Sequence, residues 1–281
     1  MTIMAGKETE DREYIPLESI ADNYLKYVLT RNERTLNYQR REPMFTFKSR
    51  VRYSEIGQDH LLSIPGVLNY FQDCSTFQSE GVGLGVQWLE EHKRCWVISS
   101  WQIRFLRRPK LGEEIEIGTM PYELKGILGK RNFFLKDAKG DYLVKADSLW
   151  TYLDAEQMKP VKVDEETRIA YPREEALEEE WKSRKIDIPE GGQAGEEIPV
   201  GKFLLDTNGH VNNEKYVLVA MEYVPAEFEV GYLRVEYKRS AVLGDVMIPM
   251  VFREQDRVVV ALQDREGSVF AVVEFERGKL C

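Results

Sequence analysis

The sequence predicts an α+β fold built from two copies of one unit, each a long helix lying on an antiparallel sheet. In each half of the chain a helical stretch is followed by several runs of alternating apolar residues, which are typical of strands. In addition, short segments of the first half recur in the second half in the same order. Because a series of such matches is rare by chance, we interpret them as a duplication.

Two pairs of segments carry the duplication. The segment Leu106–Glu113 resembles Tyr237–Asp245, with one residue inserted in the second copy. The segment Leu135–Gly140 resembles Leu262–Gly267, and both contain Asp-x-x-Gly between strand-like runs. Such stretches are typical of hairpin turns.

The elements of the first copy can be read in order. Alternating apolar residues from Phe45 to Tyr53 predict a strand. A helix is expected to follow near Pro65, since proline is tolerated in a first turn, and to end at the glycine-rich segment 81–85. Strand-like runs then occupy residues 96–105, 114–122, 131–136 and 142–152.

This pattern divides the chain into four parts. Residues 1–43 are a polar N-terminal extension with one possible helix at 21–30, and residues 44–163 form the first unit. Residues 164–196 are rich in Glu, Gly, Pro and Lys, which predicts a linker. The second unit, 197–281, begins with a short expected strand at 203–205. Its helix, at 217–224, is apolar on every side and is therefore expected to be buried.

Composition limits the class of protein. A net charge of −9 argues against broad nucleic-acid binding, which requires a basic surface. The cysteines Cys74, Cys95 and Cys281 have neither metal-ligand spacing nor the pattern of a disulfide framework, so we expect no metal, no cofactor and a reducing, cytoplasmic setting. No apolar run approaches the ~18 residues of a membrane-spanning helix.

The most informative stretch of the chain is Asp206–Tyr216. Asp206, Asn208 and His210 alternate along a short loop, and alternate side chains of an extended segment point the same way. An acid, an amide and an imidazole can therefore converge beside a helix N-terminus, where free N–H groups can hold a developing negative charge. Taken as an isolated triplet, the same residues also fit a helix cap followed by a surface histidine.

The full stretch Asp206-x-Asn208-x-His210-Val211-Asn212-Asn213-x-Lys215-Tyr216 resembles the catalytic signature of the acyl-ACP thioesterases of plants and bacteria. Three further segments resemble the same family, and the similarity extends from about Phe45 to the C-terminus. They are Trp96–Trp101 running on to Arg108-Pro109 and Gly112-Glu113, then Ala146–Trp150, and Glu236–Arg239.

The resemblance implies a tandem (double) hotdog fold, in which each long helix is wrapped by a curved antiparallel sheet. It implies hydrolysis of the thioester that joins a fatty acyl chain to the phosphopantetheine arm of acyl carrier protein (ACP). The N-terminal hotdog would shape the acyl pocket and the C-terminal hotdog would carry the catalytic groups. An acyl-CoA thioesterase and a non-catalytic acyl-binding hotdog protein remain alternatives, and either a monomer or a homodimer is compatible with two fused hotdogs.

The resemblance implies that Asp206, Asn208 and His210 are the catalytic residues, and the chemistry of thioester hydrolysis suggests what each group could do. Asp206 would activate water or orient its neighbours, Asn208 would position water or polarise the carbonyl, and His210 would move a proton near neutral pH. The N–H groups of Val211 and Asn212 are candidate oxyanion donors.

One departure from the family leaves the base for water open. Plant members have Glu-Cys at the positions held here by Ser240 and Ala241, so neither a glutamate base nor a cysteine nucleophile is present there. Ser240 can replace the carboxylate only as a hydrogen-bonding group, and otherwise it is a neutral strand residue. Glu236, four residues upstream, is a second candidate base or a solvated side chain.

Two surfaces complete the expected site. The helix and loop from Ile64 to Gly85 would line the acyl tunnel through Leu68, Phe71 and Phe77, although each also fits core packing. ACP is acidic as a family, so a basic patch is expected to dock it; scattered solvated charges are the alternative. The densest basic cluster is Arg104, Arg107, Arg108 and Lys110, and Lys130, Arg131, Lys238 and Arg239 are further candidates.

Overall fold

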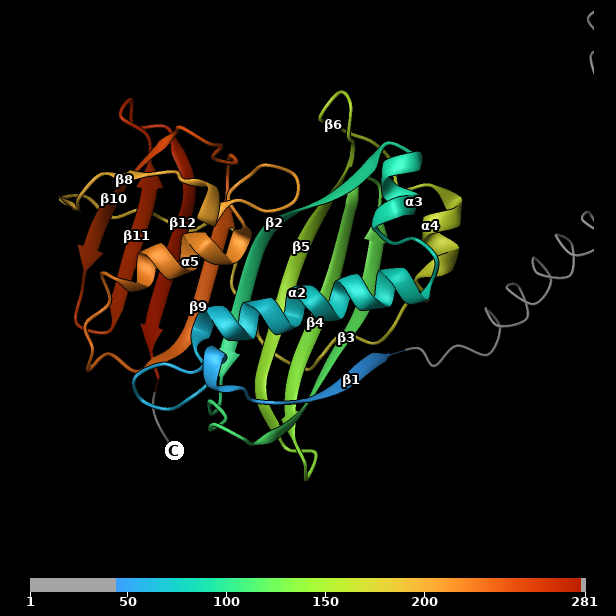
Figure 1. Ribbon diagram of the computed structural model, residues 1–281, viewed down its shortest axis with the longest axis horizontal. Coiled ribbons are helices and arrows are strands. Elements are labelled where there is room, and N and C mark those ends of the chain that lie inside the picture. Colours follow the sequence, from blue (N-terminus) through green and yellow to red (C-terminus); the bar gives the residue numbers. More distant parts are fainter. Residues whose placement is uncertain (1–43, 279–281) are drawn as a thin grey trace, which may run out of the picture. The chain divides into compact units, whose positions relative to one another are not determined.

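The computed structural model describes residues 44–278, and in this part of the chain two helix-on-sheet lobes share one continuous antiparallel sheet (Figure 1). The predicted helix at 21–30 and the rest of the extension 1–43 lie outside the described residues. The tandem hotdog expected from the sequence is confirmed.

The N-terminal lobe contains one long helix, two short helices and most of the long strands. The strand and short 3-10 helix that open it are followed by the long helix, and four long strands come next. In chain order its elements are β1 (Phe45–Arg50), η1 (Tyr53–Glu55), α2 (Ile64–Gly81), α3 (Val86–Glu91), β2 (Arg94–Phe105), β3 (Glu114–Lys125), β4 (Leu128–Asp137), β5 (Tyr142–Asp154), β6 (Lys159–Pro160) and α4 (Glu165–Ala170).

The C-terminal lobe repeats this order with shorter elements. A short strand and a 3-10 helix again precede the helix, and four strands again follow it. The elements are β7 (Gln193–Ala194), β8 (Ile198–Pro199), η2 (Lys202–Leu204), α5 (Asn213–Met221), β9 (Val230–Tyr237), β10 (Val246–Arg253), β11 (Arg257–Gln263) and β12 (Val269–Arg277).

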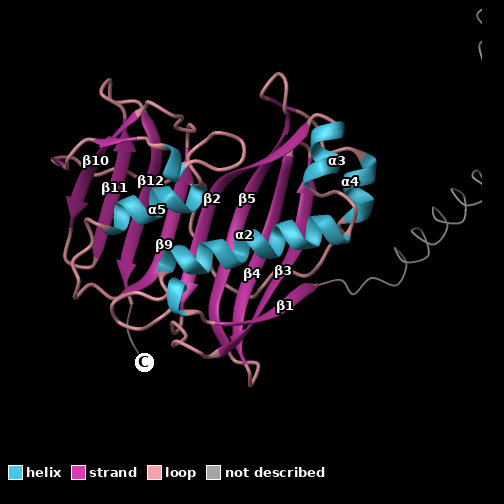
Figure 2. Cartoon of the chain, in the orientation of Figure 1, coloured by secondary structure: helices cyan, strands magenta, loops and turns pink. Residues whose placement is uncertain are grey.

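The two lobes are joined edge to edge by their first long strands. The sheet order is β1-β3-β4-β5-β2-β9-β12-β11-β10-β7, and β2 pairs with β9 from Ser100 opposite Glu236 to Arg104 opposite Tyr232. Helices α2 and α5 lie on the same face of this sheet (Figure 2). The arrangement places the start of α5 beside the junction between the lobes.

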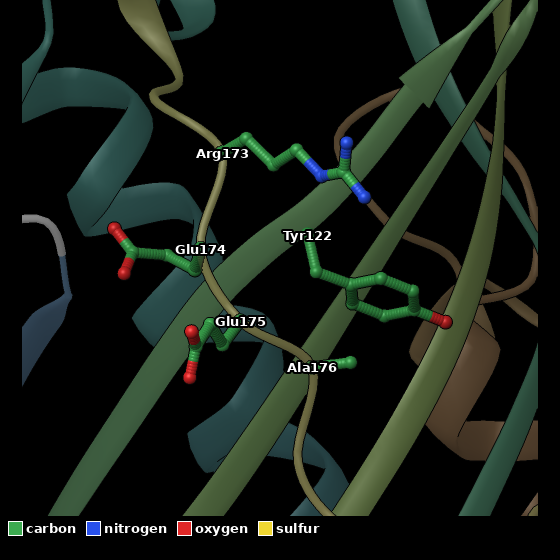
Figure 3. Close-up of a pocket in the computed structure, with 5 residues that line it drawn as sticks. All are labelled: Tyr122, Arg173, Glu174, Glu175 and Ala176. Atoms are coloured by element: carbon green, nitrogen blue, oxygen red, sulfur yellow. The ribbon is translucent and has the colours of Figure 1, made fainter.

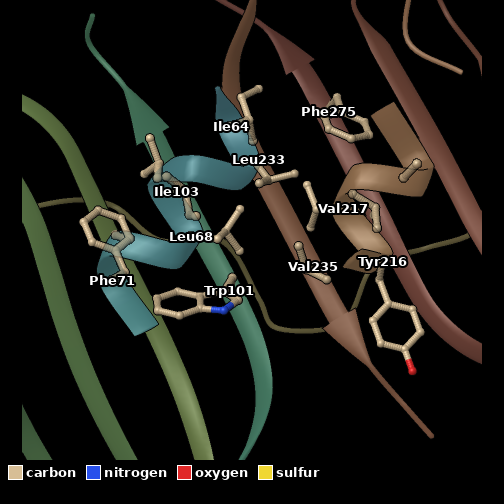
Figure 4. Packing of buried hydrophobic residues seen from close by; sticks show 14 of the residues in the cluster. Ile64, Leu68, Phe71, Trp101, Ile103, Tyr216, Val217, Leu233, Val235 and Phe275 are labelled. Atoms are coloured by element: carbon tan, nitrogen blue, oxygen red, sulfur yellow. The ribbon is translucent and has the colours of Figure 1, made fainter. Parts of the chain in front are cut away.

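A continuous apolar core lies between the helices and the sheet. Phe71 of α2 packs against Trp101 at 6.1 Å and Phe133 at 5.3 Å between ring centroids. The same core continues to Val217 of α5 and Val235 of β9 (Figure 4). Each fully buried side chain of this size contributes ~1.5–3 kcal/mol to folding, so the two lobes stabilise each other.

Local capping explains where the two helices begin. The Ser63 hydroxyl accepts a hydrogen bond from the N–H of Gly66 at 3.1 Å, and Pro65 lies in the first turn of α2. The Asn212 side chain accepts from the N–H of Glu214 at 3.3 Å and caps α5. An N-capping side chain at the same place in both lobes fixes the path of the preceding loops.

Several expected elements differ in detail. Residues 203–205 are not a strand, because Lys202–Leu204 forms a 3-10 helix. Helix α5 starts earlier than predicted, at Asn213, and ends at Met221. The prediction that it is buried on every side is wrong at Leu218, which is 39% exposed, because only the face toward the sheet is covered. The first strand ends at Arg50 rather than at Tyr53.

The predicted insertion between the repeated segments is also wrong. The N–H groups of Leu106 and Arg107 both donate to the carbonyl of Leu143. In the second lobe the N–H groups of Lys238 and Arg239 both donate to the carbonyl of Phe270. Leu106 therefore corresponds to Lys238, and the two segments match residue for residue.

Within the segment 164–196, residues 177–186 pack on the sheet face opposite the helices. On β2, Trp101 and Ile103 face the helical core, so the intervening Gln102 faces the other way, and it donates to the carbonyl of Lys182 at 2.9 Å. The N–H of Leu177 donates to the Asn132 side chain at 2.9 Å. The segment lacks apolar periodicity because polar side chains of the sheet bind its backbone.

Among residues 44–278, no helix is long and apolar enough to cross a membrane.

Candidate active site

The loop 206–212 before α5 is held in a tight turn by its own backbone. The N–H of Asp206 donates to the carbonyl of His210 at 2.7 Å, and the N–H of Gly209 donates to the carbonyl of Asp206 at 3.2 Å. Gly209 has a φ of 75°, a conformation that favours glycine. Val211, two residues after Gly209, pairs with Leu205 across the turn. The ends of the loop are thus fixed, while its middle residues Thr207, Asn208 and Gly209 are exposed.

The carboxylate of Asp206 organises this turn. Its Oδ1 accepts hydrogen bonds from the N–H of Asn208 at 2.8 Å and from the N–H of His210 at 3.1 Å. The side-chain amide of Asn208 approaches its Oδ2 at 3.5 Å. Asp206 therefore lies with Asn208 and fixes the backbone at the other two residues of the predicted triplet.

His210 is half-buried beside the segment that follows β9. It forms a backbone bridge with Val242, which joins the loop to that segment. Within residues 44–278 its imidazole makes no hydrogen bond, either to Asp206 or to Asn208. The three predicted residues thus share one loop, but the imidazole remains free to meet a substrate.

The predicted oxyanion donors are already used. The N–H of Val211 donates to the carbonyl of Ala241 at 2.9 Å, and the N–H of Asn212 donates to the carbonyl of Leu204 at 2.9 Å. The role expected of these two N–H groups does not fit this geometry. Asn213 is the first residue of α5, so its N–H has no acceptor within the helix. That N–H and the Asn208 amide are two donors at this end of α5 that are not committed to a short hydrogen bond.

Two tyrosines that sequence reasoning passed over support the loop. The N–H of Ala241 donates to the Tyr216 hydroxyl at 2.8 Å, and the Tyr237 hydroxyl donates to the carbonyl of Asn213 at 2.9 Å. Burial raises the pKa of Tyr216 to about 12, so it remains protonated near neutral pH. The sequence could have pointed to both tyrosines, because Tyr216 ends the signature stretch and Tyr237 lies in a segment that resembles the family.

The two candidate replacements for the missing carboxylate lie apart. Ser240 is exposed and directly precedes Ala241, whose carbonyl holds the loop. Glu236 is 6% exposed, and its carboxylate accepts the N–H of Ile186 at 3.1 Å on the sheet face opposite α5. We therefore leave Glu236 out of the proposed site.

The predicted acyl-pocket residues separate into two groups. Leu68 and Phe71 are buried on the sheet side of α2, at 2% and 0% exposure, and Phe71 contacts Trp101 (Figure 4). Phe77 is 48% exposed and packs edge-on against Phe47 at 5.4 Å between centroids. Only Leu68 and Phe71 lie on the side of α2 that faces the sheet core.

Two surface depressions lie away from the loop. One, of about 420 Å³, is lined by Tyr122 and by Arg173–Ala176, where the chain passes around the N-terminal lobe (Figure 3). The other, of about 300 Å³, is lined by residues near Gly191 and by Val251–Glu254. Neither is lined by loop residues or by the predicted acyl-pocket residues.

The predicted basic cluster is divided by ion pairs. Arg104 pairs with Glu179 at 2.8 Å, Arg107 pairs with Glu113 at 2.6 Å, and Arg108 pairs with Asp59. Residues 107–110 follow the end of β2, whereas the loop 206–212 packs beside the end of β9. Because β2 and β9 are antiparallel, this cluster and the loop lie at opposite ends of the central strands.

The further basic candidates also differ in position. Lys238 and Arg239 directly follow β9 and so lie at the same end as the loop. Lys238 approaches Glu236 at 3.4 Å and Arg239 pairs with Asp264. Lys130 pairs with Glu123 at 3.3 Å, and Arg131 points into the N-terminal lobe, where it donates to Gln78 at 2.6 Å.

Comparison with protein families gives two matches. The sequence model described as the acyl-ACP thioesterase N-terminal domain matches residues 42–171. The model described as the acyl-ACP thioesterase C-terminal domain matches residues 190–266.

Curated relatives give the same indication at modest identity. A chloroplastic acyl-(acyl-carrier-protein) hydrolase of Cuphea viscosissima is 30% identical over 227 residues, which cover 74% of this chain and 55% of that protein. A chloroplastic oleoyl-acyl carrier protein thioesterase of Arabidopsis thaliana is 25% identical over 243 residues, 78% of this chain and 66% of that protein. The chain spans about half the length of the first curated relatives it matches.

Solved structures share the fold. An acyl-ACP thioesterase from Bacteroides thetaiotaomicron superposes with a TM-score of 0.78 at 19% identity, covering 84% of this chain and 98% of that chain. The 12:0-ACP thioesterase from Umbellularia californica superposes with a TM-score of 0.72 at 21% identity, covering 84% and 97%.

Proposed function

This chain belongs to the acyl-ACP thioesterase family, and from that premise we propose that it hydrolyses the thioester between a fatty acyl chain and ACP. The products would be free fatty acid and holo-ACP, which ends chain elongation. The observation that carries the proposal is the loop 206–212 just before α5, which carries an ordered carboxylate, an amide and an imidazole with no hydrogen-bond partner among the described residues.

The chemistry can be divided among these groups. Water attacks the thioester carbonyl, the carbonyl oxygen becomes an oxyanion, and the thiolate departs and takes up a proton. We assign the proton that the departing thiolate takes up to His210, because its imidazole has no competing partner among the described residues and histidine commonly transfers protons in enzymes. Asp206 is assigned two roles: its Oδ1 holds two N–H groups of the loop, and its Oδ2, which within residues 44–278 only the Asn208 amide approaches at 3.5 Å, accepts the proton of the attacking water.

The oxyanion is assigned to two neutral donors. The Asn208 amide bonds Asp206 only at 3.5 Å, so it can turn to a substrate at little cost. The N–H of Asn213 lies at the start of α5, where the helix dipole favours negative charge. One such donor is typically worth ~3–4 kcal/mol in the transition state.

Incubation of the purified protein with acyl-ACPs of graded chain length tests the proposal directly. We expect release of free fatty acid that depends on His210. Matched acyl-CoAs form the second arm of the experiment, and a higher kcat/KM on CoA would favour the acyl-CoA alternative. Tight acyl-ACP binding with no acid released would favour the non-catalytic alternative.

The carrier is proposed to dock at the end of the sheet that holds the loop. Lys238 and Arg239 correspond in the duplication to Leu106 and Arg107, which lie at the other end. Reversing the charge of Lys238 and Arg239 should raise KM for acyl-ACP but not for a short soluble thioester. The matched control reverses Arg107 and Arg108, and an equal rise in KM there would contradict this placement.

The cytoplasmic setting remains a proposal based on cysteine usage. Cys74 and Cys95 are free thiols, as is usual in a reducing compartment. The names of the plant relatives place those proteins in chloroplasts. Fractionation of the source cells with an antibody against this protein would test the assignment.

A further inference from the structure

Two tyrosines brace the loop 206–212 from opposite sides. Tyr216 lies on α5 (Figure 4), and its hydroxyl accepts the N–H of Ala241, in the segment after β9, at 2.8 Å. Tyr237 ends β9, and its hydroxyl donates to the carbonyl of Asn213, at the start of α5, at 2.9 Å. The two rings meet edge to face with 5.8 Å between their centroids. Each element thus holds the backbone of the other through a phenol.

The N-terminal lobe makes the same backbone contact but offers no N–H to a phenol. In the C-terminal lobe the N–H of Val211 donates to the carbonyl of Ala241 at 2.9 Å. In the N-terminal lobe the N–H of Leu62 makes the corresponding bond to the carbonyl of Pro109 at 2.8 Å. Because proline has no N–H, the bond between Tyr216 and Ala241 has no equivalent there.

The places of both tyrosines are apolar in the N-terminal lobe. Val67 stands on α2 where Tyr216 stands on α5, at the same step after the preceding loop. Phe105 ends β2 as Tyr237 ends β9. Val67 is fully buried and Phe105 is 9% exposed, so both places are filled without a hydroxyl. The duplicated fold therefore does not require the two hydroxyls, and the lobe that has them is the lobe that carries the triplet.

The brace holds two groups to which chemistry is assigned. His210 forms a backbone bridge with Val242, the residue after the one whose N–H Tyr216 accepts. Asn213 supplies the proposed oxyanion N–H, and Tyr237 holds its carbonyl. Burial raises the pKa of Tyr237, so its hydroxyl keeps the proton that it donates. The proton donor and the oxyanion donor are thus each tied to one of the two phenols.

We propose that Tyr216 and Tyr237 are positioning residues for the hydrolysis. Tyr216 places the imidazole of His210 against the departing thiolate, and Tyr237 places the N–H of Asn213 against the oxyanion. The proposal rests on the thioesterase function proposed above. Both phenols act through the backbone, so their removal should lower kcat and leave KM nearly unchanged. A misplacement of about 1 Å can cost roughly a hundredfold in rate, and the remaining backbone bonds of the loop should limit the loss to about tenfold.

The test uses two soluble thioesters of the same fatty acid, so that docking of a carrier does not enter. The alkyl thioester releases a basic thiolate that takes up a proton, whereas the aryl thioester releases a weakly basic thiolate that can leave without one. In Tyr216→Phe, kcat should fall about tenfold on the alkyl thioester and less than about twofold on the aryl thioester. In Tyr237→Phe, kcat should fall about tenfold on both, because both reactions form an oxyanion.

The N-terminal lobe supplies two matched changes. Phe105→Tyr adds a hydroxyl at the place that corresponds to Tyr237 and should leave kcat and KM unchanged. Ala241→Pro copies Pro109, because it removes the N–H that Tyr216 accepts and leaves the ring in place. It should reproduce the loss confined to the alkyl thioester, and it replaces Tyr216→Phe if that variant fails to fold.

Two outcomes would overturn the proposal. Equal losses on the alkyl and the aryl thioester in Tyr216→Phe would mean that this phenol only stabilises the fold. A rise in KM with unchanged kcat, in either tyrosine variant, would mean that the phenol serves substrate binding.

Amide hydrogen exchange separates this proposal from the proposed function, because it needs no turnover. The amide of Ala241 should exchange roughly tenfold faster in Tyr216→Phe, since it loses its acceptor. Hydrolysis by the wild-type protein with unchanged rates in both tyrosine variants would keep the function and reject the positioning roles. Faster exchange in Tyr216→Phe, in a protein that hydrolyses no thioester, would reject the function and keep the bracing bond.

Discussion

The loop before α2 and the loop before α5 share one backbone but differ in their side chains. In the N-terminal lobe the N–H of Gly57 donates to Leu61 at 2.9 Å and that of His60 donates to Gly57 at 3.0 Å. In the C-terminal lobe the same two bonds link Asp206 with His210 and Gly209 with Asp206. The turn therefore belongs to the duplicated fold and not to the chemistry.

This correspondence assigns each residue of the signature a counterpart. The positions of Asp206, Asn208 and His210 are held in the first lobe by Gly57, Asp59 and Leu61. The duplicated backbone by itself therefore forms a closed loop at the start of each helix. The acid, the amide and the imidazole are present in only one of the two copies.

A second difference lies opposite the loops. Arg108 donates to the Asp59 carboxylate and to the carbonyl of Leu62 at 3.3 Å, so it covers the first loop. Its counterpart is Ser240, whose short side chain leaves the Asn208 amide uncovered. An arginine closes the loop in the lobe without the triplet, and a small residue leaves it open in the lobe that has one.

Among the exchanges between the two loops, replacing His210 by its counterpart residue should have the largest effect on kcat. His210→Leu installs the residue of the first lobe and should lower kcat on acyl-ACP by roughly a hundredfold to ten-thousandfold, because proton transfer is lost. Leu61→His, the matched control, should leave kcat unchanged. Thermal melts should show both variants folded. Near-normal turnover by His210→Leu would show that the imidazole is not the proton carrier.

Asp206 separates positioning from base chemistry. Asp206→Asn retains an oxygen for the two N–H groups, so the melting temperature should change little while kcat falls about a hundredfold. Asp206→Gly, which copies Gly57, should in addition lower the free energy of unfolding by ~1–3 kcal/mol, because it leaves two N–H groups of the loop without an acceptor. Full activity in Asp206→Asn would exclude the carboxylate as a base.

Ser240 offers a change in the opposite direction. Ser240→Glu restores the carboxylate found in plant members of the family and should raise kcat about tenfold if a base for water is limiting. Ser240→Arg copies Arg108 and should instead lower kcat by covering Asn208. Steady-state kinetics on one acyl-ACP would measure both. Identical rates in the two variants would contradict the difference drawn between the covered and the open loop.

The strands and the signature could be predicted from the sequence because both are local patterns. Alternation in the strands and the spacing of Asp206, Asn208 and His210 involve neighbouring residues only. The short strand expected at 203–205 was wrong because three apolar residues do not distinguish a strand from the 3-10 helix Lys202–Leu204. Leu218 was misplaced because a short apolar helix gives no sign of which side the sheet will cover.

The rest of the site depended on contacts distant in sequence. The segment after β9 packs on the loop, and for that reason the N–H of Val211 donates to the carbonyl of Ala241. The carboxylate of Glu236 faces away from α5, because it accepts a hydrogen bond from the N–H of Ile186. The sequence predicted only a linker for the segment that contains Ile186. Residue types indicate which groups can do chemistry, whereas the pairing of distant segments decides which of them remain free.

Backbone strain in the two loops gives the smallest expected effect. Gly209 and its counterpart His60 both have positive φ, 75° and 59°. A Cβ at Gly209 meets nothing within 4 Å, so Gly209→Ala should cost only the conformational penalty, about 1 kcal/mol of unfolding free energy. His60→Gly should relieve strain of the same origin and raise that free energy by a few tenths of a kcal/mol, because the gain is partly offset by greater freedom of the unfolded chain. Urea denaturation would measure both, and kcat should be unchanged in His60→Gly. A stabilising Gly209→Ala would show that the two turns do not share this conformation.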